Sequence, residues 1–407
     1  MSYSIVWRWF AVLGLVIVAH GAAAAQTFSS GSTGADGAFA PTTSVQLPIP
    51  NDGVFNFTTI NIPAGVTVSF ATSAGVRRPP ISFLATGNVV VAGRIDVSGG
   101  NGGAGSGGAQ LFSNAGVGGP GGFDGGAGSN GLHSSSGGAG LGPGGGLPGS
   151  STAFPGHAGH LVAAGGVSGG RAYGEARLVP LVGGSGGGGG ASQQGATGSG
   201  GGGGGGALLL ASSGTMTVSG TLAANGGAGG PSTGPPGGSG SGGAIRLVAT
   251  TLLGNPTIDV NGGPGASPGR IRVEAFTNAA TVNGAATGAL TVGTPDALAF
   301  NVVGLRIAAI GGVSAPAAPV GSYGTPDIVL PAGTTSPVTV TLEAREIPLG
   351  TTITVAATPL SGAPVLATST PLIGTPAAAT ATATLAIPTM QPSVLSATAV
   401  FTLSGAP

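Results

Sequence analysis

Two aspartates at equivalent positions are the residues of this chain best suited to acid–base chemistry. Asp96 and Asp259 each stand at the centre of an Ile-Asp-Val triplet. Alternation along a strand puts the flanking Ile and Val on the inner side and both carboxylates on the outer side. If one repeat lies between them, the carboxylates are about 10 Å apart, near the separation used in inverting sugar hydrolysis. Arg94 or Arg246 would assist on the same face.

The alternative interpretation is that these carboxylates only keep the surface soluble. Sugar sites use aromatic platforms, yet the chain after its first 25 residues has no Trp, and its tyrosines there are Tyr173 and Tyr323. Cys and Lys are absent and no Ser has a fixed His partner, so an activated nucleophile is lacking. We expect no catalytic activity, with Asp96, Asp259 and Arg94 as the alternative catalytic set.

The histidines suggest a second chemistry, metal binding. His133, His157 and His160 lie in the longest glycine-rich stretch with Asp124, and Glu175 is a further carboxylate there. Two imidazoles and a carboxylate are a plausible start of a zinc site. The alternative is a set of solvated loop histidines, because nothing in the sequence orders the loop around them. We expect neither a metal nor another cofactor.

Composition excludes nucleic acid as a partner. The 407 residues include 11 basic and 11 acidic ones, and charged residues are only 5% of the chain, so no basic patch can meet a phosphate backbone. The 87 Gly and 31 Pro suggest disorder, but hydrophobic residues make up 41%. Apolar strands that carry a core, with glycine-rich segments between them, reconcile the two observations.

The N-terminus has the features of a secretory signal peptide over residues 1–25. Arg8 supplies the positive charge, Phe10 to Val18 the apolar region, and Ala23-Ala24-Ala25 the small-residue cleavage site. The apolar run is shorter than the roughly 20 residues of a membrane span. We expect cleavage after Ala25, export, and no membrane span in the mature protein.

Repeated strand segments position the two aspartates. Residues 87–100 align without a gap with residues 214–227, and 257–263 match the second half of each. Short strands separated by Gly and Asn turns are typical of a β-solenoid. We predict one β-helix over residues 54–276, within a domain of residues 26–296. Segments 88–98, 215–225 and 257–261 should stack in register, with these side chains buried: Ile95, Val97, Leu222, Ile258 and Val260.

Glycine-rich insertions occupy about residues 99–206 and 226–243. Many glycines recur every third residue, a period that suits a polyproline-II backbone. Glycine loses the most freedom on ordering and has no side chain to bury, so order requires a template. The tract Gly200–Gly206 has nothing to dock, and we expect it to be mobile.

The composition changes near Leu298. Glycine thins, and Thr-rich strands separated by prolines recur about every ten residues, as in a sandwich. We predict an immunoglobulin-like β-sandwich over residues 297–407. The whole chain is thus expected to be all-β: a parallel β-helix with long insertions, then a sandwich.

Some short sequence segments of the chain resemble segments of known proteins. They are Asp36-Gly37-Ala38-Phe39, Gly53-Val54-Phe55-Asn56-Phe57, the segment 118–126, and Gly206-Ala207-Leu208-Leu209-Leu210-Ala211. They look like a group of Gly-rich secreted bacterial proteins of unknown function, and the repeats resemble the right-handed parallel β-helix of pectate-lyase-like proteins. The resemblance covers about residues 30–276 and implies fold and export. It supplies no catalytic residues, because lyase active-site patterns are not matched.

These observations favour a secreted structural or adhesive protein of the cell surface or matrix. The expected partners are extracellular polysaccharide or cell-surface components, and self-association is a further expectation. One alternative is a polysaccharide-binding or polysaccharide-degrading β-helix protein, either a lyase or a glycoside hydrolase. Another is an ice-binding protein that uses Thr215, Thr217 and Thr221.

Overall fold

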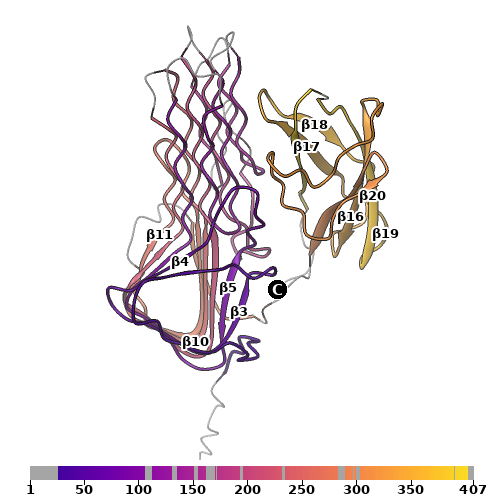
Figure 1. The fold of residues 1–407 in the computed structure, drawn as a ribbon. Coiled ribbons are helices and arrows are strands. Elements are labelled where there is room, and N and C mark those ends of the chain that lie inside the picture. Colours follow the sequence, from indigo (N-terminus) through magenta and orange to yellow (C-terminus); the bar gives the residue numbers. More distant parts are fainter. Residues whose placement is uncertain are drawn as a thin grey trace, which may run out of the picture.

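The structure is a computed structural model, and every regular element in its described part is a β-strand. It consists of parallel sheets, a bundle of extended glycine-rich segments above them, and two antiparallel sheets beside the bundle (Figure 1). The predicted signal peptide and His133 lie outside the described residues. Those residues are 26–105, 112–130, 135–150, 155–161, 170, 172–192, 196–231, 234–282, 289–296, 298, 303–388 and 390–401.

Two parallel sheets form the body of the protein, and from β3 to β12 successive parts of the chain pass from one sheet to the other and back. The first sheet has the order β1-β3-β5-β8-β10-β12-β13, with β6 paired to β3 and β8. It contains β1 (Gly37–Phe39), β3 (Val54–Ile62), β5 (Ile81–Ala85), β6 (Val89–Val91), β8 (Ala207–Val218), β10 (Ala244–Leu253), β12 (Arg270–Asn278) and β13 (Leu290–Gly293). The second, in the order β11-β9-β7-β4-β2, contains β2 (Val45–Leu47), β4 (Thr67–Phe70), β7 (Arg94–Asp96), β9 (Thr221–Ala223) and β11 (Thr257–Asp259).

The predicted register of the repeats is confirmed. Ile95 pairs with Leu222, and Leu222 pairs with Ile258, in parallel ladders. All three are fully buried between the sheets, as are Val97 and Val260. Burying one such side chain contributes about 1.5–3 kcal/mol, so the stacked apolar rows hold this body together.

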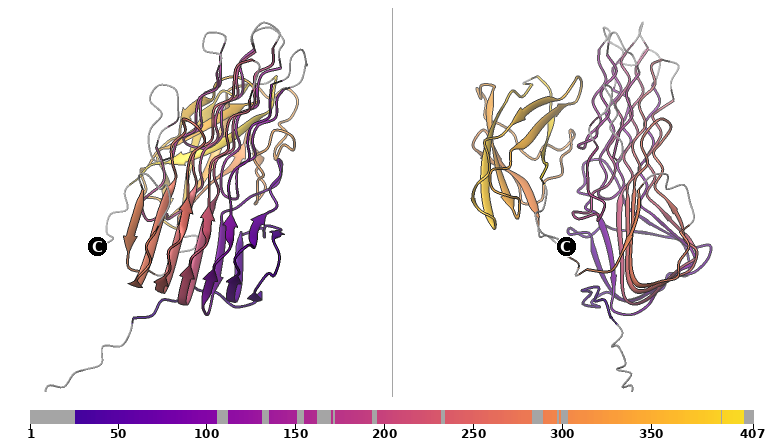
Figure 2. Two further views of the ribbon diagram at one scale, coloured as in Figure 1. Left: turned by 90° about the vertical axis from the view of Figure 1, so that its left-hand side faces the viewer. Right: turned by 180° about the vertical axis from the view of Figure 1, so that it is seen from behind.

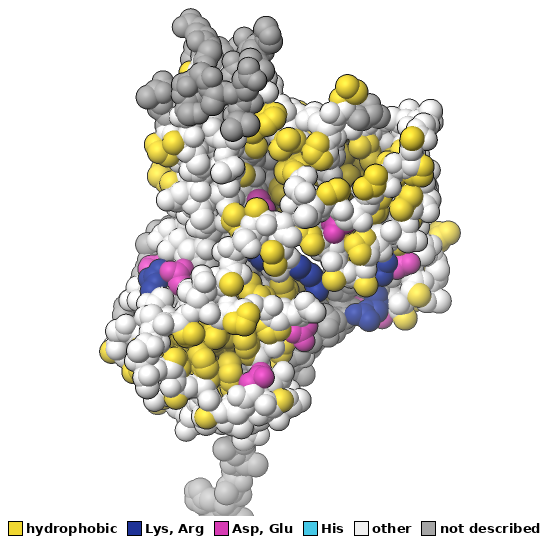
Figure 3. Space-filling model, viewed as in Figure 1, with side chains coloured by type: hydrophobic (Ala, Val, Ile, Leu, Met, Phe, Trp, Pro, Cys, Tyr) yellow, Lys and Arg dark blue, Asp and Glu magenta, His cyan; other side chains and the backbone are white. Residues whose placement is uncertain are grey.

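The N-terminal strands of the body, β1, β3, β4 and β5, carry a cluster of phenylalanines. Phe39 stacks on Phe57 with centroids 4.9 Å apart, and Phe83 meets Phe55 edge-on at 5.0 Å. Phe39 and Phe55 are only partly buried, and Figure 3 shows hydrophobic side chains gathered over these N-terminal strands. These strands therefore present an apolar end that includes the partly exposed rings of Phe39 and Phe55.

The N-terminal segment crosses the outer face of the first sheet. The amide of Phe28 donates to Thr250 Oγ1 (2.9 Å), and the hydroxyls of Ser30 and Ser32 donate to the carbonyls of Ala85 and Phe57 (2.8 Å each). Phe28 is buried there with Leu84, Leu209 and Val248. These contacts tie β10, β5 and β3 together from outside.

The glycine-rich segments form an ordered bundle, which overturns the prediction that Gly200–Gly206 is mobile. All seven of these residues are buried. The bundle leaves the sheets after β7 and β9 and returns directly into β8 and β10 (Figure 2). It consists of residues 99–105, 112–130, 135–150, 155–161, 183–192, 196–206, 225–231 and 234–243.

Hydrogen bonds in the bundle repeat every third residue. The amides of Gly184, Gly187 and Gly190 donate to the carbonyls of Gly205, Gly202 and Ser199 at 2.7, 2.9 and 2.8 Å. A polyproline-II helix has three residues per turn and no internal hydrogen bonds, so each of its three faces can bond a different neighbour. The three-residue spacing expected from the sequence is therefore the spacing of the contacts between segments.

Two segments lie at the centre of the bundle, residues 183–190 and residues 198–206. Each is hydrogen-bonded to six other segments. The neighbours of 183–190 are residues 122–130, 135–142, 144–150, 155–161, 196–206 and 234–243; those of 198–206 are residues 97–105, 112–119, 122–130, 183–190, 225–231 and 234–243. A Cβ at Gly187 would lie 2.1 Å from the carbonyl oxygen of Gly238, and one at Gly204 would lie 1.9 Å from that of Gly184. At such positions only glycine fits, and apart from Ser185 and Ser199 both central segments consist of glycine.

The C-terminal part forms two antiparallel sheets around a separate core. One sheet has the order β15-β14-β16-β20-β19 and the other the order β18-β17-β21. The larger contains β14 (Gly304–Ile310), β15 (Val313–Ser314), β16 (Val338–Arg345), β19 (Ile373–Thr375) and β20 (Ala378–Leu385); the smaller contains β17 (Ile353–Pro359), β18 (Val365–Thr368) and β21 (Ser393–Ala399). On β16 every second residue is buried, as period-two alternation requires.

This C-terminal part contacts the bundle through the backbone. The amide of Gly362 donates to the carbonyl of Gly137 (2.8 Å). The hydroxyl of Ser361 donates to the backbone carbonyl of Ser136 (2.7 Å). Figures 1 and 2 show the two antiparallel sheets alongside the bundle. Glycine at 138 permits the approach, since a Cβ there would lie 2.5 Å from the carbonyl oxygen of Leu360.

Candidate functional site

The predicted pair of aspartates lies on the outer face of the second parallel sheet. Asp96 on β7 and Asp259 on β11 both pair with Ala223 on the strand between them. Their backbones are therefore two strand spacings apart, about 10 Å, as the sequence predicts. Both residues are half-buried, and both carboxylates lie on the side opposite the apolar core.

Asp96 is held in its ionised form by its neighbours. Arg94 donates to Asp96 Oδ2 from Nε (3.0 Å) and from a terminal nitrogen (2.8 Å), and the amide of Ser98 donates to Oδ1 (2.9 Å). Burial acts to raise the pKa of Asp96, but the hydrogen bonds from Ser98 and Arg94 outweigh it and leave the pKa below its ordinary value. A general acid needs the opposite shift.

Arg246 does not lie on this face, so the expectation that it assists Asp96 is wrong. It belongs to β10 of the other parallel sheet and is 7% exposed. A terminal nitrogen of its guanidinium donates to Glu274 Oε2 (2.9 Å), and Arg272 Nε donates to Glu274 Oε1 (2.8 Å). One buried carboxylate thus joins two arginines on adjacent strands, an arrangement that serves structure.

The residues named as alternative metal ligands are not assembled in the described part of the chain. There, no group of three or more His, Cys, Asp or Glu side chains is close enough to hold a metal ion. Asp124 forms an ion pair with Arg78 and accepts from the amide of Gly118 (2.7 Å). The backbone amides of His157 and His160 bond neighbouring segments of the bundle. Glu175 accepts from the amide of Arg177 (3.2 Å).

The threonines proposed for ice binding lie on two sheets. Thr215 and Thr217 point outward from β8, whereas Thr221 belongs to β9 of the other sheet. Thr215 pairs with Thr251, which pairs with Thr277. The outer face of the first sheet therefore carries a row of three threonines on adjacent strands, of which the sequence analysis found only the first.

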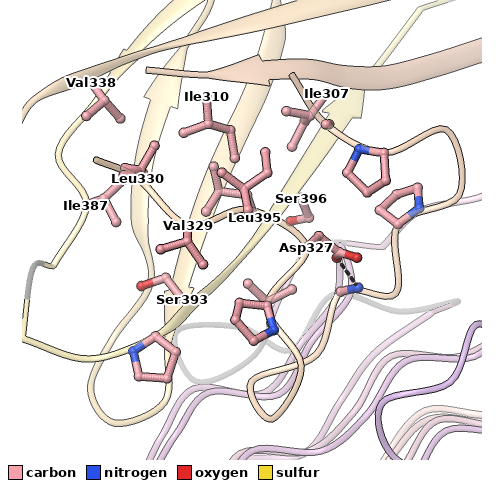
Figure 4. Close-up of a pocket in the computed structure, with 18 of the residues that line it drawn as sticks. Ile307, Ile310, Asp327, Val329, Leu330, Val338, Ile387, Ser393, Leu395 and Ser396 are labelled. Atoms are coloured by element: carbon pink, nitrogen blue, oxygen red, sulfur yellow. Dashed lines mark hydrogen bonds between the residues drawn. The ribbon is translucent and has the colours of Figure 1, made fainter. Parts of the chain in front are cut away.

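A large cavity lies in the C-terminal part, at the edge where β21 faces β14 (Figure 4). Its volume is about 940 Å³, at the upper end of the range for small-molecule sites. It arises because the smaller sheet ends at β21, which pairs only with β17, while the larger sheet continues beyond β14 to β15. The inner apolar residues of this edge thus lack an opposing strand.

The walls of this cleft carry branched aliphatic side chains together with polar ones. Ile307 and Ile310 come from β14, Leu395 from β21, and Val329 and Leu330 from the loop that crosses the open edge (Figure 4). None of the described lining residues is aromatic. The hydroxyl of Ser393 on β21 is buried and has no hydrogen-bond partner among the described residues. The cleft can therefore hold an aliphatic molecule but offers no ring on which a sugar would stack.

Some charged groups at the cleft have partners within the protein, and one does not. The carboxylate of Asp327 accepts from the amides of Val320 and Gly321 (2.8 Å each). Arg306 pairs with Glu343. Arg77, from the segment before β5, donates to the carbonyl of Asn51 and forms no ion pair with the described acidic residues. One arginine at the cleft thus retains an uncompensated charge.

A smaller cavity of about 170 Å³ shares Gly321, Val394, Leu395 and Ser396 with the cleft. It is lined on its other side by Arg78, Phe123 and Asp124, so it lies between the C-terminal part and the base of the bundle. The Arg78 side chain is 10% exposed, and its Nε is buried without an acceptor. Nearby, burial and then the charge of Asp124 raise the pKa of Tyr323.

This cleft was not predicted from the sequence. Its walls combine β14 and the loop that follows it with β21, which lies far along the chain, and the alternation of both strands looks like that of any sandwich. The one available signal was the proline-rich loop, where the lining includes Pro316, Pro319, Pro326 and Pro331. A segment with so many prolines cannot supply the missing strand.

Comparison with protein-family models, with curated proteins and with solved structures gives no match to this chain. Within the described residues, no helix has the length and apolar character to cross a membrane.

Proposed function

We propose that this protein is a secreted structural or adhesive component of the cell surface or matrix, without catalytic activity. We further propose that the body is a right-handed parallel β-helix and that the C-terminal part is an immunoglobulin-like sandwich. The observation that carries the proposed role is the glycine bundle, a long ordered projection whose two central segments contain only glycine and two serines.

The construction of the bundle supports a mechanical role. Both insertions begin and end in strands of the body, so the sheets hold the bundle at its base. Its interior is filled by backbone, and the C-terminal part braces one side through Gly362 and Ser361. The described segments of the bundle extend away from the sheets (Figure 1), and a projection built in this way suits presentation of a surface to a partner.

The enzyme alternative, a polysaccharide lyase or glycoside hydrolase, rests on Asp96 and Asp259. Their separation suits it, but the ion pair of Asp96 with Arg94 opposes it. The ice-binding alternative gains one observation, the row Thr215, Thr251 and Thr277. Hydroxyls on adjacent strands repeat about every 4.8 Å, and such regular spacing suits an ordered solid surface.

The test is to offer the purified full chain a panel of extracellular polysaccharides and to measure binding and product release separately. We expect export with an N-terminus at Gln26, and saturable binding or self-assembly without product release. Product release that Asp96→Asn or Asp259→Asn abolishes would establish the enzyme alternative. Inhibition of ice recrystallisation that Thr251→Val changes and Thr257→Val does not would establish the other.

A further inference from the structure

We propose that the cleft between β14 and β21 binds a long-chain fatty acid, with its aliphatic chain between the two sheets and its carboxylate at Arg77 and Arg78. This goes beyond the proposed structural role. It concerns a different part of the molecule and does not depend on the bundle or on polysaccharide binding.

The walls select for an aliphatic chain. Ile307 from one sheet and Leu395 from the other are only partly buried, although both face the sandwich core. An apolar ligand that covers them gains the free energy of removing that surface from water. The lining is branched aliphatic and proline in character, without aromatic residues, so flexible methylene groups fit it better than a flat ring.

The charges select for an anionic head. Asp327 and Arg306 are already satisfied within the protein. The remaining cation is Arg77. Its neighbour Arg78 is paired with Asp124 through a terminal nitrogen, but its buried Nε lacks an acceptor. A carboxylate supplies both the negative charge and the acceptor, and hydrogen bonds to charged groups are among the stronger ones. Leu395 and Ser396 line both cavities, so the aliphatic walls of the cleft and the site of Arg78 are next to each other.

The experiment measures displacement of a fluorescent acyl carboxylate, dansyl-undecanoic acid, from the full chain by laurate, dodecanol and butyrate. Laurate should displace it best, dodecanol less well, and butyrate not at all. Anionic phosphatidylglycerol vesicles serve as the other source of acyl chains. The absence of saturable binding, or binding to vesicles without displacement by laurate, would overturn the proposal.

Two alanines provide a matched pair of variants. Ala397 on β21 and Ala367 on β18 pair with opposite sides of the same residue, Val355, and both pack against the same core. Only Ala397 lines the cleft. Ala397→Trp should weaken laurate binding roughly tenfold or more, whereas Ala367→Trp should not. Equal loss in both variants would show that the effect is one of folding and would contradict the proposal.

The contact between the ligand carboxylate and the protein is tested by substituting Arg77, an exposed residue whose replacement should not disturb the fold. Arg77→Gln should weaken laurate roughly five- to tenfold and leave dodecanol unchanged. Arg177→Gln is the control, because Arg177 pairs with Asp296 away from the cleft. An unchanged ratio of laurate to dodecanol affinity in Arg77→Gln would refute the assignment of the carboxylate.

Discussion

The parallel-sheet body and the glycine bundle are both ordered, but they are held together in opposite ways. In the body, rows such as Ile95, Leu222 and Ile258 bury aliphatic side chains completely. In the bundle, residues 183–190 and 198–206 are buried with almost no side chains at all. The first region depends on the hydrophobic effect, and the second on backbone hydrogen bonds and close backbone contact.

This difference shows that a glycine-rich composition does not by itself mean disorder. Ordering one residue costs about 1–2 kcal/mol, while one backbone hydrogen bond contributes about 0.5–1.5 kcal/mol net. A single glycine segment would therefore stay unfolded. In the bundle each central segment bonds six neighbours, and strands of the body fix where the insertions begin and end, so the sheets provide the template.

The largest expected effect is in the body. Ile258→Asp places a charge where Ile258 is completely buried and paired with Leu222. We expect a loss of roughly 4 kcal/mol or more in unfolding free energy, measured by chemical denaturation. Thr257→Asp, one residue earlier and outward-facing, should change it by less than about 1 kcal/mol. Similar losses in the two variants would contradict the assigned faces of β11.

A smaller loss is expected in the bundle from one methyl group. A Cβ at Gly203 would lie 2.3 Å from the carbonyl oxygen of Val117, whereas one at Gly100 would lie 3.4 Å from the same atom. Gly203 and Gly100 share a hydrogen bond, so the pair is closely matched. Gly203→Ala should cost about 2–3 kcal/mol.

The control variant Gly100→Ala should change stability by less than about 1 kcal/mol, because it meets only ordinary contacts and reduces the freedom of the unfolded chain. Thermal unfolding and amide exchange of residues 183–206 measure both variants. Equal tolerance of alanine at the two positions would mean that the central segments are loosely packed, and the comparison with the body would fail.

The smallest expected effect is a difference between the two regions in how stability depends on acidic pH. The pKa of Asp96 is lowered in the folded protein from an ordinary value of 3.8. Its contribution is therefore fully present above about pH 4 and is lost as the pH falls through the folded pKa. Asp96→Asn should remove an acid-side slope worth less than about 1 kcal/mol. The central bundle segments contain no titratable side chain, so their exchange protection should not share that slope.

The repeats were predictable because period-two alternation and aligned Gly turns fix which side chains face the core. Ile95, Leu222 and Ile258 therefore appear where the sequence indicates. Glycine every third residue also indicated the repeat of the bundle. The order of Gly200–Gly206 was not predictable in the same way, because one glycine segment has nothing to bury, and its hydrogen bonds depend on how many similar segments lie around it.

The candidate sites were less predictable. The position of Asp96 relative to Asp259 follows from the repeat, but the guanidinium of Arg94 on Asp96 is a side-chain arrangement that alternation does not specify. The separation of Asp124 from the histidines depends on how the bundle folds. The cleft beside β21 depends on the unequal widths of two sheets, which no local pattern reports.

Hydrogen–deuterium exchange of the glycine amides in the intact chain tests the central claim most directly. The account predicts that amides of residues 183–190 and 198–206 exchange as slowly as those of β8 and β10, because each central segment donates to buried carbonyls on several sides. Exchange of these amides at the rate of an unstructured peptide, while β8 and β10 stay protected, would show that the glycine-rich segments are not ordered.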